Sequence, residues 1–174
     1  MTTLARMSLL VAAIAAATIA GAWAFQLAGY APCELCLKQR LPYYIGVPLA
    51  LLAFVFATRN LRAVSKACLA LAGLTFAVSM VLGAYHAGVE WGWWPGPSDC
   101  TGDFAAASSS QDFLKQLQTI QVVRCDAVAL RIFKLSLAGW NAVISAGLTV
   151  LAVFGVARSR AFSDRDGSYS AAAK

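Results

Sequence analysis

Residues 67–89 read ACLALAGLTFAVSMVLGAYHAGV, a stretch without a single charged side chain. A helix needs about 20 predominantly apolar residues to cross the hydrocarbon core of a bilayer, so this stretch predicts a membrane-spanning helix. Three further uncharged runs occupy 7–33, 41–58 and 135–157, of which 41–58 is the shortest. The chain has 174 residues, of which 60% are hydrophobic and 13% charged, whereas roughly a quarter are charged in soluble domains. The sequence therefore predicts an all-α, integral membrane four-helix bundle.

We expect a single domain over residues 1–174, because four crossings leave little chain for a separate soluble unit. No internal repeat is present. The expected order is four spans joined by two outward loops and one inward loop, followed by a tail whose polar part from Ser163 to Lys174 is expected to be disordered. The spans are placed at about 7–28, 41–58, 67–86 and 135–157, the outward loops at about 29–40 and 87–134, and the tail at 158–174.

The charged residues predict how the spans are oriented. One side, made of the N-terminus, the 59–66 loop and the C-terminal tail, carries 8 basic and 2 acidic residues, and the other side carries 6 of each. Loops rich in Lys and Arg stay in the cytoplasm, so both termini are expected to be cytoplasmic. This orientation accounts for the net charge of +6 without a nucleic-acid partner. A cleaved secretory signal is an alternative for the N-terminal run, although signal cores have only about 7–15 residues.

Four of the five cysteines fall in the expected outward segments, where an oxidising compartment lets disulfides persist. Cys100 and Cys125 bracket a long polar loop, and a structural staple is the alternative to a redox role for them. Cys33 and Cys36 enclose only two residues, so closing that loop would remove little chain entropy. Short Cys-x-x-Cys pairs are suited instead to thiol–disulfide exchange. A metal site and an inert pair are the alternatives, but structural zinc needs four ligands. Cys68 is expected to be inert.

The residues around the Cys-x-x-Cys favour a thiolate. If 33–40 is helical, Cys33, Cys36 and Arg40 share one face. A cysteine near a helix N-terminus gains from the backbone N–H groups, and Arg40 adds a positive charge one turn away. The alternative for Arg40 is an anchor at the membrane edge. Pro42 disfavours helix at the residue before it, so the helix is expected to kink or restart there.

Other polar and aromatic residues mark the outward side. His86 is the only histidine and lies near the outward end of the third span. Polar groups at that depth are often functional, with a structural pairing as the alternative. Trp91, Trp93 and Trp94 are expected to anchor the interface. The segment 112–121 has apolar residues at helical spacing and predicts a short interfacial helix, or a loop helix packed on the bundle.

The second span begins with CELCLKQR at residues 33–40, which resembles the disulfide bond formation protein B (DsbB) family. The order of features is also similar, with four spans, a Cys-x-x-Cys in the first outward loop and a separated cysteine pair in the second. Tyr85-His86 and the segment Gly139-Trp140-Asn141 resemble further parts of the family. The resemblance covers nearly the whole chain and departs mainly in the long loop.

The resemblance implies a thiol oxidoreductase of the bacterial inner membrane that reoxidises a periplasmic, thioredoxin-like (DsbA-like) dithiol oxidase. It implies that the electrons pass to ubiquinone or menaquinone. Cys100 and Cys125 would take electrons from the partner and pass them to Cys33 and Cys36.

The resemblance also implies a quinone site. Cys36 would face the quinone, Arg40 would stabilise the thiolate or the reduced quinone, and His86 would lie close by; no metal is expected. A relative of vitamin K epoxide reductase is a rival, but there the loop cysteines precede the Cys-x-x-Cys, and here they follow it. A rival of another class is a noncatalytic scaffold or small transporter stapled by disulfides.

Overall fold

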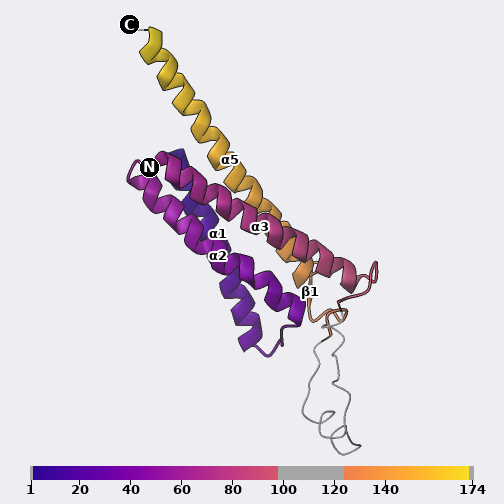
Figure 1. The fold of residues 1–174 in the computed structure, drawn as a ribbon. Helices are drawn as coiled ribbons and strands as arrows, with labels where there is room; N and C mark the ends of the chain where they lie inside the picture. The colour runs from indigo at the N-terminus through magenta and orange to yellow at the C-terminus, as the bar shows by residue number, and fades with distance from the viewer. Residues whose placement is uncertain (1, 98–123, 173–174) are drawn as a thin grey trace, which may run out of the picture.

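The structure is a computed structural model that describes residues 2–97 and 124–172 (Figure 1). Its helices are α1 (Thr3–Leu27), α2 (Glu34–Thr58), α3 (Arg62–Glu90) and α5 (Leu137–Ala172), and a short ribbon pairs β1 (Arg131–Ile132) with β2 (Leu135–Ser136). Within these described residues, four helices contain a stretch long and apolar enough to cross a membrane. The prediction of an all-α four-helix membrane bundle is confirmed.

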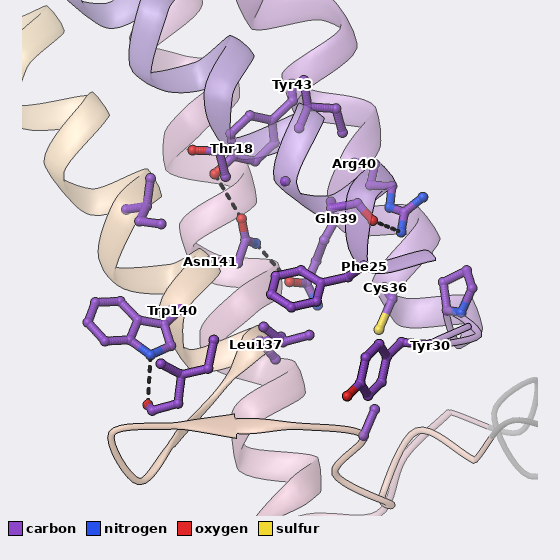
Figure 2. Close-up of a pocket in the computed structure, with 18 of the residues that line it drawn as sticks. Thr18, Phe25, Tyr30, Cys36, Gln39, Arg40, Tyr43, Leu137, Trp140 and Asn141 are labelled. Atoms are coloured by element: carbon purple, nitrogen blue, oxygen red, sulfur yellow. Dashed lines mark hydrogen bonds between the residues drawn. The ribbon is translucent and has the colours of Figure 1, made fainter. Parts of the chain in front are cut away.

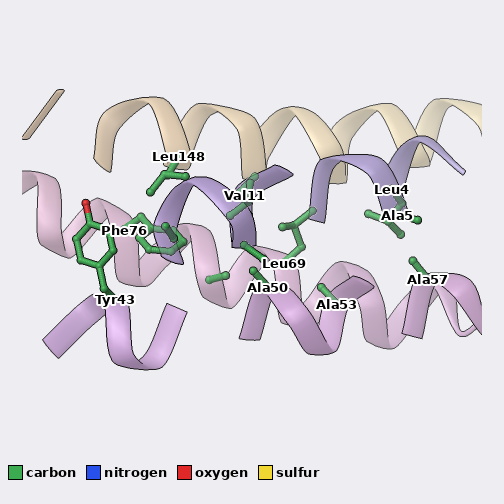
Figure 3. Close-up of a cluster of buried hydrophobic side chains, with 14 residues drawn as sticks. Leu4, Ala5, Val11, Tyr43, Ala50, Ala53, Ala57, Leu69, Phe76 and Leu148 are labelled. Atoms are coloured by element: carbon green, nitrogen blue, oxygen red, sulfur yellow. The ribbon is translucent and has the colours of Figure 1, made fainter. Parts of the chain in front are cut away.

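The helices pack through interlocked large and small side chains. α3 makes its main contacts with α2 and α5, and α1 packs against the same two helices. Leu69 and Phe76 of α3 and Leu148 of α5 are buried among alanines (Figure 3). Small residues let spanning helices approach closely, because lipid offers no hydrophobic gain on association. At Gly83 of α3, a Cβ atom would lie 2.8 Å from the backbone nitrogen of Ala142 in α5.

α2 begins earlier than hydropathy indicated. Cys33 is its N-cap, and the Cys33 sulfur accepts a hydrogen bond from the backbone N–H of Cys36 at 3.3 Å. Residues 34–40 therefore lie in the helix, and only 28–33 join α1 to α2. The helix does not restart at Pro42, since α2 is continuous from Glu34 to Thr58. Spanning helices tolerate proline where neighbouring helices and local adjustments compensate for the lost hydrogen bond.

The ribbon before α5 has no counterpart in the expectations from sequence. Its strands are antiparallel and are joined by Phe133 and Lys134, whose φ angles are 50° and 68°. Turns with two such residues usually carry Asn-Gly, so no ordinary turn signal marks this one. The indole N–H of Trp140 donates to the carbonyl oxygen of Ile132 at 2.9 Å. This bond ties the ribbon to the first turn of α5.

Both chain ends lie at the end of the bundle opposite the ribbon (Figure 1). The tail, expected to be disordered, is helical as far as Ala172, because no proline interrupts α5. Which end faces the cytoplasm stays a prediction. Trp91, Trp93 and Trp94 are exposed at the ribbon end, as interface anchors would be. The helix expected at 112–121 lies outside the described residues.

Candidate functional site

The Cys-x-x-Cys forms a close pair of free thiols at the start of α2. The sulfurs of Cys33 and Cys36 are 2.8 Å apart, and Cys33 is buried. The hydrogen bond shared with Cys36 lowers the pKa of the Cys33 thiol, and a second one with His86 adds to this, while burial opposes both. Thiolates are the attacking species in disulfide exchange. The sequence favoured a thiolate in the Cys-x-x-Cys pair, and the hydrogen bonds of Cys33 favour a thiolate at that residue.

His86 brings the second cysteine pair to the first. Its Nε2 lies 3.7 Å from the sulfur of Cys33 and 3.2 Å from the carbonyl oxygen of Cys125. Cys125, which is in a disulfide, packs in one buried cluster with Cys33, Leu35 and Val89. Cysteines from the two distant pairs of the sequence are therefore neighbours in space. Cys100 lies outside the described residues.

Cys36 faces a different surrounding from Cys33. It lines a cavity of about 390 Å³ between α1, α2 and α5, at the ribbon end of the bundle (Figure 2). The wall is almost entirely apolar, and its polar side chains come mainly from α2 and α5. Such a cavity suits a ligand with a large apolar surface and a few polar atoms. Its lining includes Thr18, Phe25, Tyr30, Cys36, Gln39, Arg40, Tyr43, Trp140 and Asn141.

Arg40 lines the same cavity and is held there by α1. Its Nη1 donates to Oε1 of Gln26 at 2.6 Å, and its Nη2 donates to the carbonyl oxygen of Ala22 at 3.2 Å. The guanidinium carbon lies 5.7 Å from the centre of the Trp23 ring, a cation–π distance. None of these three partners carries a charge, so the positive charge of Arg40 is available to a ligand in the cavity. Gln26 was not expected from the sequence.

A chain of hydrogen bonds runs from the cysteines into the middle of the bundle. Gln39 stands between His86 and Asn141, with Nε2 2.7 Å from Nδ1 of His86 and Oε1 2.7 Å from Nδ2 of Asn141. The Tyr43 hydroxyl donates to Oδ1 of Asn141 at 2.8 Å and lies 2.9 Å from Oγ of Ser145. Because the chain uses α2, α3 and α5, it fixes how these helices are rotated against one another at this end.

Similarity to a known protein family identifies the bundle. The family model of disulfide bond formation protein DsbB matches residues 5–155. The chain belongs to the DsbB family. An uncharacterized protein of Rickettsia prowazekii (strain Madrid E), RP370, is 27% identical over 123 residues, which cover 70% of this chain and 69% of that protein. No solved structure gives a significant match.

Membership of the DsbB family makes this chain a multi-pass membrane protein of disulfide bond formation. The predicted site residues Cys33, Cys36, Arg40, His86 and Cys125 all lie at the ribbon end of the bundle. His86, however, is absent from the cavity wall and lies on the side of Cys33. Its role toward a quinone stays a prediction.

Most of the polar residues that are hydrogen-bonded in a chain from His86 were not predicted from the sequence of this DsbB-family protein. Gln39 and Tyr43 are spaced by four, as are Asn141 and Ser145, so each pair shares one helix face. Uncharged polar residues inside apolar spans often bond across helices. That spacing was the available signal, but it does not say which faces meet.

The same end of this DsbB-family chain also groups donors that could bind a metal. The ligand atoms of Cys33, Cys36 and His86 all lie within 4.8 Å of one another. A structural zinc site takes four ligands, so this set is incomplete. Nε2 of His86 would also have to leave the carbonyl oxygen of Cys125. The expectation that the protein needs no metal stays a prediction.

Proposed function

We propose that this DsbB-family protein is a thiol:quinone oxidoreductase that reoxidises a periplasmic, thioredoxin-like (DsbA-like) dithiol oxidase. The electrons pass to ubiquinone or menaquinone in the bilayer of the bacterial inner membrane. One observation carries the proposal. Cys36 lines an apolar cavity, while its partner Cys33 packs against Cys125 of the other pair. The pair thus touches a site for a lipid-soluble molecule on one side and a second disulfide on the other.

Exchange in this scheme starts at Cys100 and Cys125. A thiolate of the partner oxidase attacks their disulfide, and the partner's second thiol resolves the mixed disulfide, which leaves the loop pair reduced. The loop pair then reduces the disulfide between Cys33 and Cys36. When that dithiol closes again, two electrons and two protons pass to the quinone, which becomes quinol. The first two steps each exchange one disulfide for one dithiol, and the last step oxidises one dithiol to a disulfide while one quinone is reduced to quinol.

The remaining groups have matching roles in the proposal. The apolar cavity wall suits the ring and tail of a quinone, and Arg40 supplies a positive charge beside Cys36. That charge stabilises a thiolate at Cys36 or negative charge on a reduced oxygen. The basic residues of the opposite end favour a cytoplasmic location for it, with the cysteines in the periplasm.

Quinone reduction by the purified protein tests the proposal. A reduced thioredoxin-like periplasmic oxidase is supplied with ubiquinone or menaquinone, and absorbance is followed in the ultraviolet. Turnover is expected in the wild type and in Cys68→Ser, whose sulfur packs with the core cluster away from the site. Cys36→Ser should abolish it. Folded protein that reduces neither quinone would favour a disulfide-stapled scaffold or an oxidase with a different acceptor.

A further inference from the structure

The donor and acceptor roles along the hydrogen bonds that join His86, Gln39, Asn141 and Tyr43 can be assigned, starting from a backbone carbonyl group. The carbonyl oxygen of Cys125 can only accept a hydrogen bond, and Nε2 of His86 lies 3.2 Å from it. Nε2 must therefore carry a proton. His86 is 2% exposed, so water does not replace this contact easily. The charge of the ring then depends on whether the other nitrogen, Nδ1, is also protonated.

Gln39 determines the state of Nδ1. Its side-chain Nε2 lies 2.7 Å from Nδ1 of His86, and an amide NH₂ group is only a donor. Nδ1 must accept this bond, so it carries no proton and the ring is neutral. Gln39 is 6% exposed, and its amide oxygen is engaged by Asn141. Rotating the amide of Gln39 would therefore break two bonds, not one.

Asn141 holds Gln39 in that orientation from α5. Its Oδ1 accepts the hydroxyl proton of Tyr43 at 2.8 Å, so its NH₂ group faces the other way. There it donates to Oε1 of Gln39 at 2.7 Å and lies 3.3 Å from Oγ of Ser79. Figure 2 shows Asn141 between Tyr43 and Gln39, with both bonds drawn. The orientation set by Tyr43 is thus passed through two amides to the histidine ring.

We propose that Gln39 and Asn141 are positioning residues that hold His86 as the neutral tautomer protonated on Nε2. This N–H then points into the space where Cys33 and Cys125 meet. It donates to the Cys125 carbonyl oxygen at rest, and to the Cys33 sulfur when that sulfur becomes a thiolate, 3.7 Å away. The consequence for exchange rests on the proposed function, but the tautomer itself does not.

The opposite tautomer would be unfavourable at both ends of the ring. A proton on Nδ1 would face the NH₂ group of Gln39, and a lone pair on Nε2 would face the carbonyl oxygen of Cys125. A metal bound at Nε2 would need that same lone pair. The chain of hydrogen bonds therefore favours a donor to sulfur over a metal ligand. Glu90, whose Oε2 is buried without a hydrogen-bond partner among the described residues, is the carboxylate that would favour a doubly protonated ring.

Nitrogen-15 NMR on protein labelled at histidine tests the proposal directly, because the sequence has one histidine. The reduced protein in lipid nanodiscs at neutral pH should show one protonated and one unprotonated ring nitrogen. The protonated one should be Nε2, identified by its coupling to both ring C–H protons. A proton on Nδ1, or protons on both nitrogens, would overturn the proposal.

Variants of Gln39 test whether this residue sets the protonation state of the His86 ring. Gln39→Glu presents only acceptors to Nδ1, so it should produce the doubly protonated ring, because the Cys125 carbonyl oxygen still requires the proton on Nε2. Gln39→Leu removes the donor to Nδ1, so Nε2 should stay protonated while part of the protein takes a second proton on Nδ1. The matched control is Thr149→Ala, which removes a hydroxyl of α5 that bonds the backbone carbonyl oxygens of Gly73 and Ser145 and makes no bond to His86, Gln39 or Asn141. Its spectrum should equal the wild type. A folded Gln39→Glu protein with an unchanged spectrum would contradict the proposal.

A second measurement tests the role of these residues in disulfide exchange without any quinone. The disulfide of Cys33 and Cys36 is reduced by a small dithiol, and the rate is measured in each variant. Loss of an oriented bond to a charged sulfur corresponds to a rate roughly 10- to 100-fold lower in Gln39→Leu. If the rate does not change while the protonation state does, the role in exchange is wrong. If both change as expected but the wild type reduces no quinone, the proposed function fails and the positioning role stands.

Discussion

The sulfurs of Cys33 and Cys36 are 2.8 Å apart and both residues pack in the cluster around Cys125, yet only Cys36 lines the apolar cavity. Cys33 also hydrogen-bonds to His86. One turn of helix thus divides the pair between two possible reaction partners. Cys33 lies beside Cys125, and Cys36 lines the apolar cavity. In such an arrangement, changes on the two sides should affect different kinetic constants.

Arg40→Ala tests the membrane side. Arg40 lines the same cavity as Cys36, and its hydrogen bonds run to Gln26 and Ala22 of α1. Losing a hydrogen bond to a charged group should raise the quinone KM roughly 10-fold or more and leave the KM for the partner oxidase nearly unchanged. Arg59→Ala, an exposed arginine at the other end of the bundle, is the control. An unchanged quinone KM and turnover in Arg40→Ala would remove the role given to Arg40.

The pH dependence of Cys33 tests the thiol side. Its pKa is lowered mainly by the hydrogen bond with Cys36, so thiolate absorbance in the reduced protein should persist below the ordinary thiol pKa of about 8.5. His86→Ala should move the transition upward in pH, and Cys36→Ala, which removes the donor with the larger effect, should move it further. Because the folded pKa is the lower one, the stabilisation of the reduced protein is full above about pH 8.5 and declines as pH falls toward the folded pKa. A transition at the ordinary thiol value in the wild type would show that these bonds do not act.

Gly83→Ala tests the close approach of α3 and α5. The new methyl group would lie 2.8 Å from the backbone nitrogen of Ala142, and backbone cannot move aside cheaply. Overpacking of this kind costs about 1–3 kcal/mol in the free energy of unfolding. Thermal unfolding in detergent should show a lower Tm. Gly147→Ala on α5, where no atom lies within 4 Å of the new Cβ, should leave Tm unchanged or raise it. Equal effects at the two positions would mean that the packing at Gly83 is not tight.

Trp140→Phe tests the ribbon as part of the cavity. The change keeps an aromatic ring but removes the N–H that donates to Ile132, and both residues line the cavity. Freeing the ribbon should raise the quinone KM several-fold and leave the reduction of Cys33–Cys36 by a small dithiol unaffected. Trp91→Phe, an exposed tryptophan outside the cavity, is the control. A slower reduction of Cys33–Cys36 by the small dithiol, with an unchanged quinone KM, would mean that the ribbon acts on the cysteine pair and not on quinone binding.

The four helices and the family could be inferred from the amino-acid sequence alone. Uncharged runs as long as 7–33 and 67–89 leave few alternatives, because in hydrocarbon every backbone group must be bonded within the segment and a helix does this. The Cys-x-x-Cys was likewise readable as a redox pair, because two residues are too few for a useful staple. Local chemistry was sufficient for both inferences. The predictions about Cys100 and the helix at 112–121 remain predictions, since they lie outside the described residues.

The contacts of the polar residues around the cysteine pair could not be predicted from the sequence, because they depend on how the helices pack. The rotation of α3 places His86 at Cys33 and the backbone of Cys125, which are contacts that the sequence did not predict. Gln39 and Asn141 are 102 residues apart in the chain and meet because α2 and α5 turn these faces toward each other. Hydropathy indicates that a helix spans the membrane, but it does not set the rotation about the helix axis. That rotation follows from contacts such as Gly83 against Ala142, where small residues allow one close fit between helices.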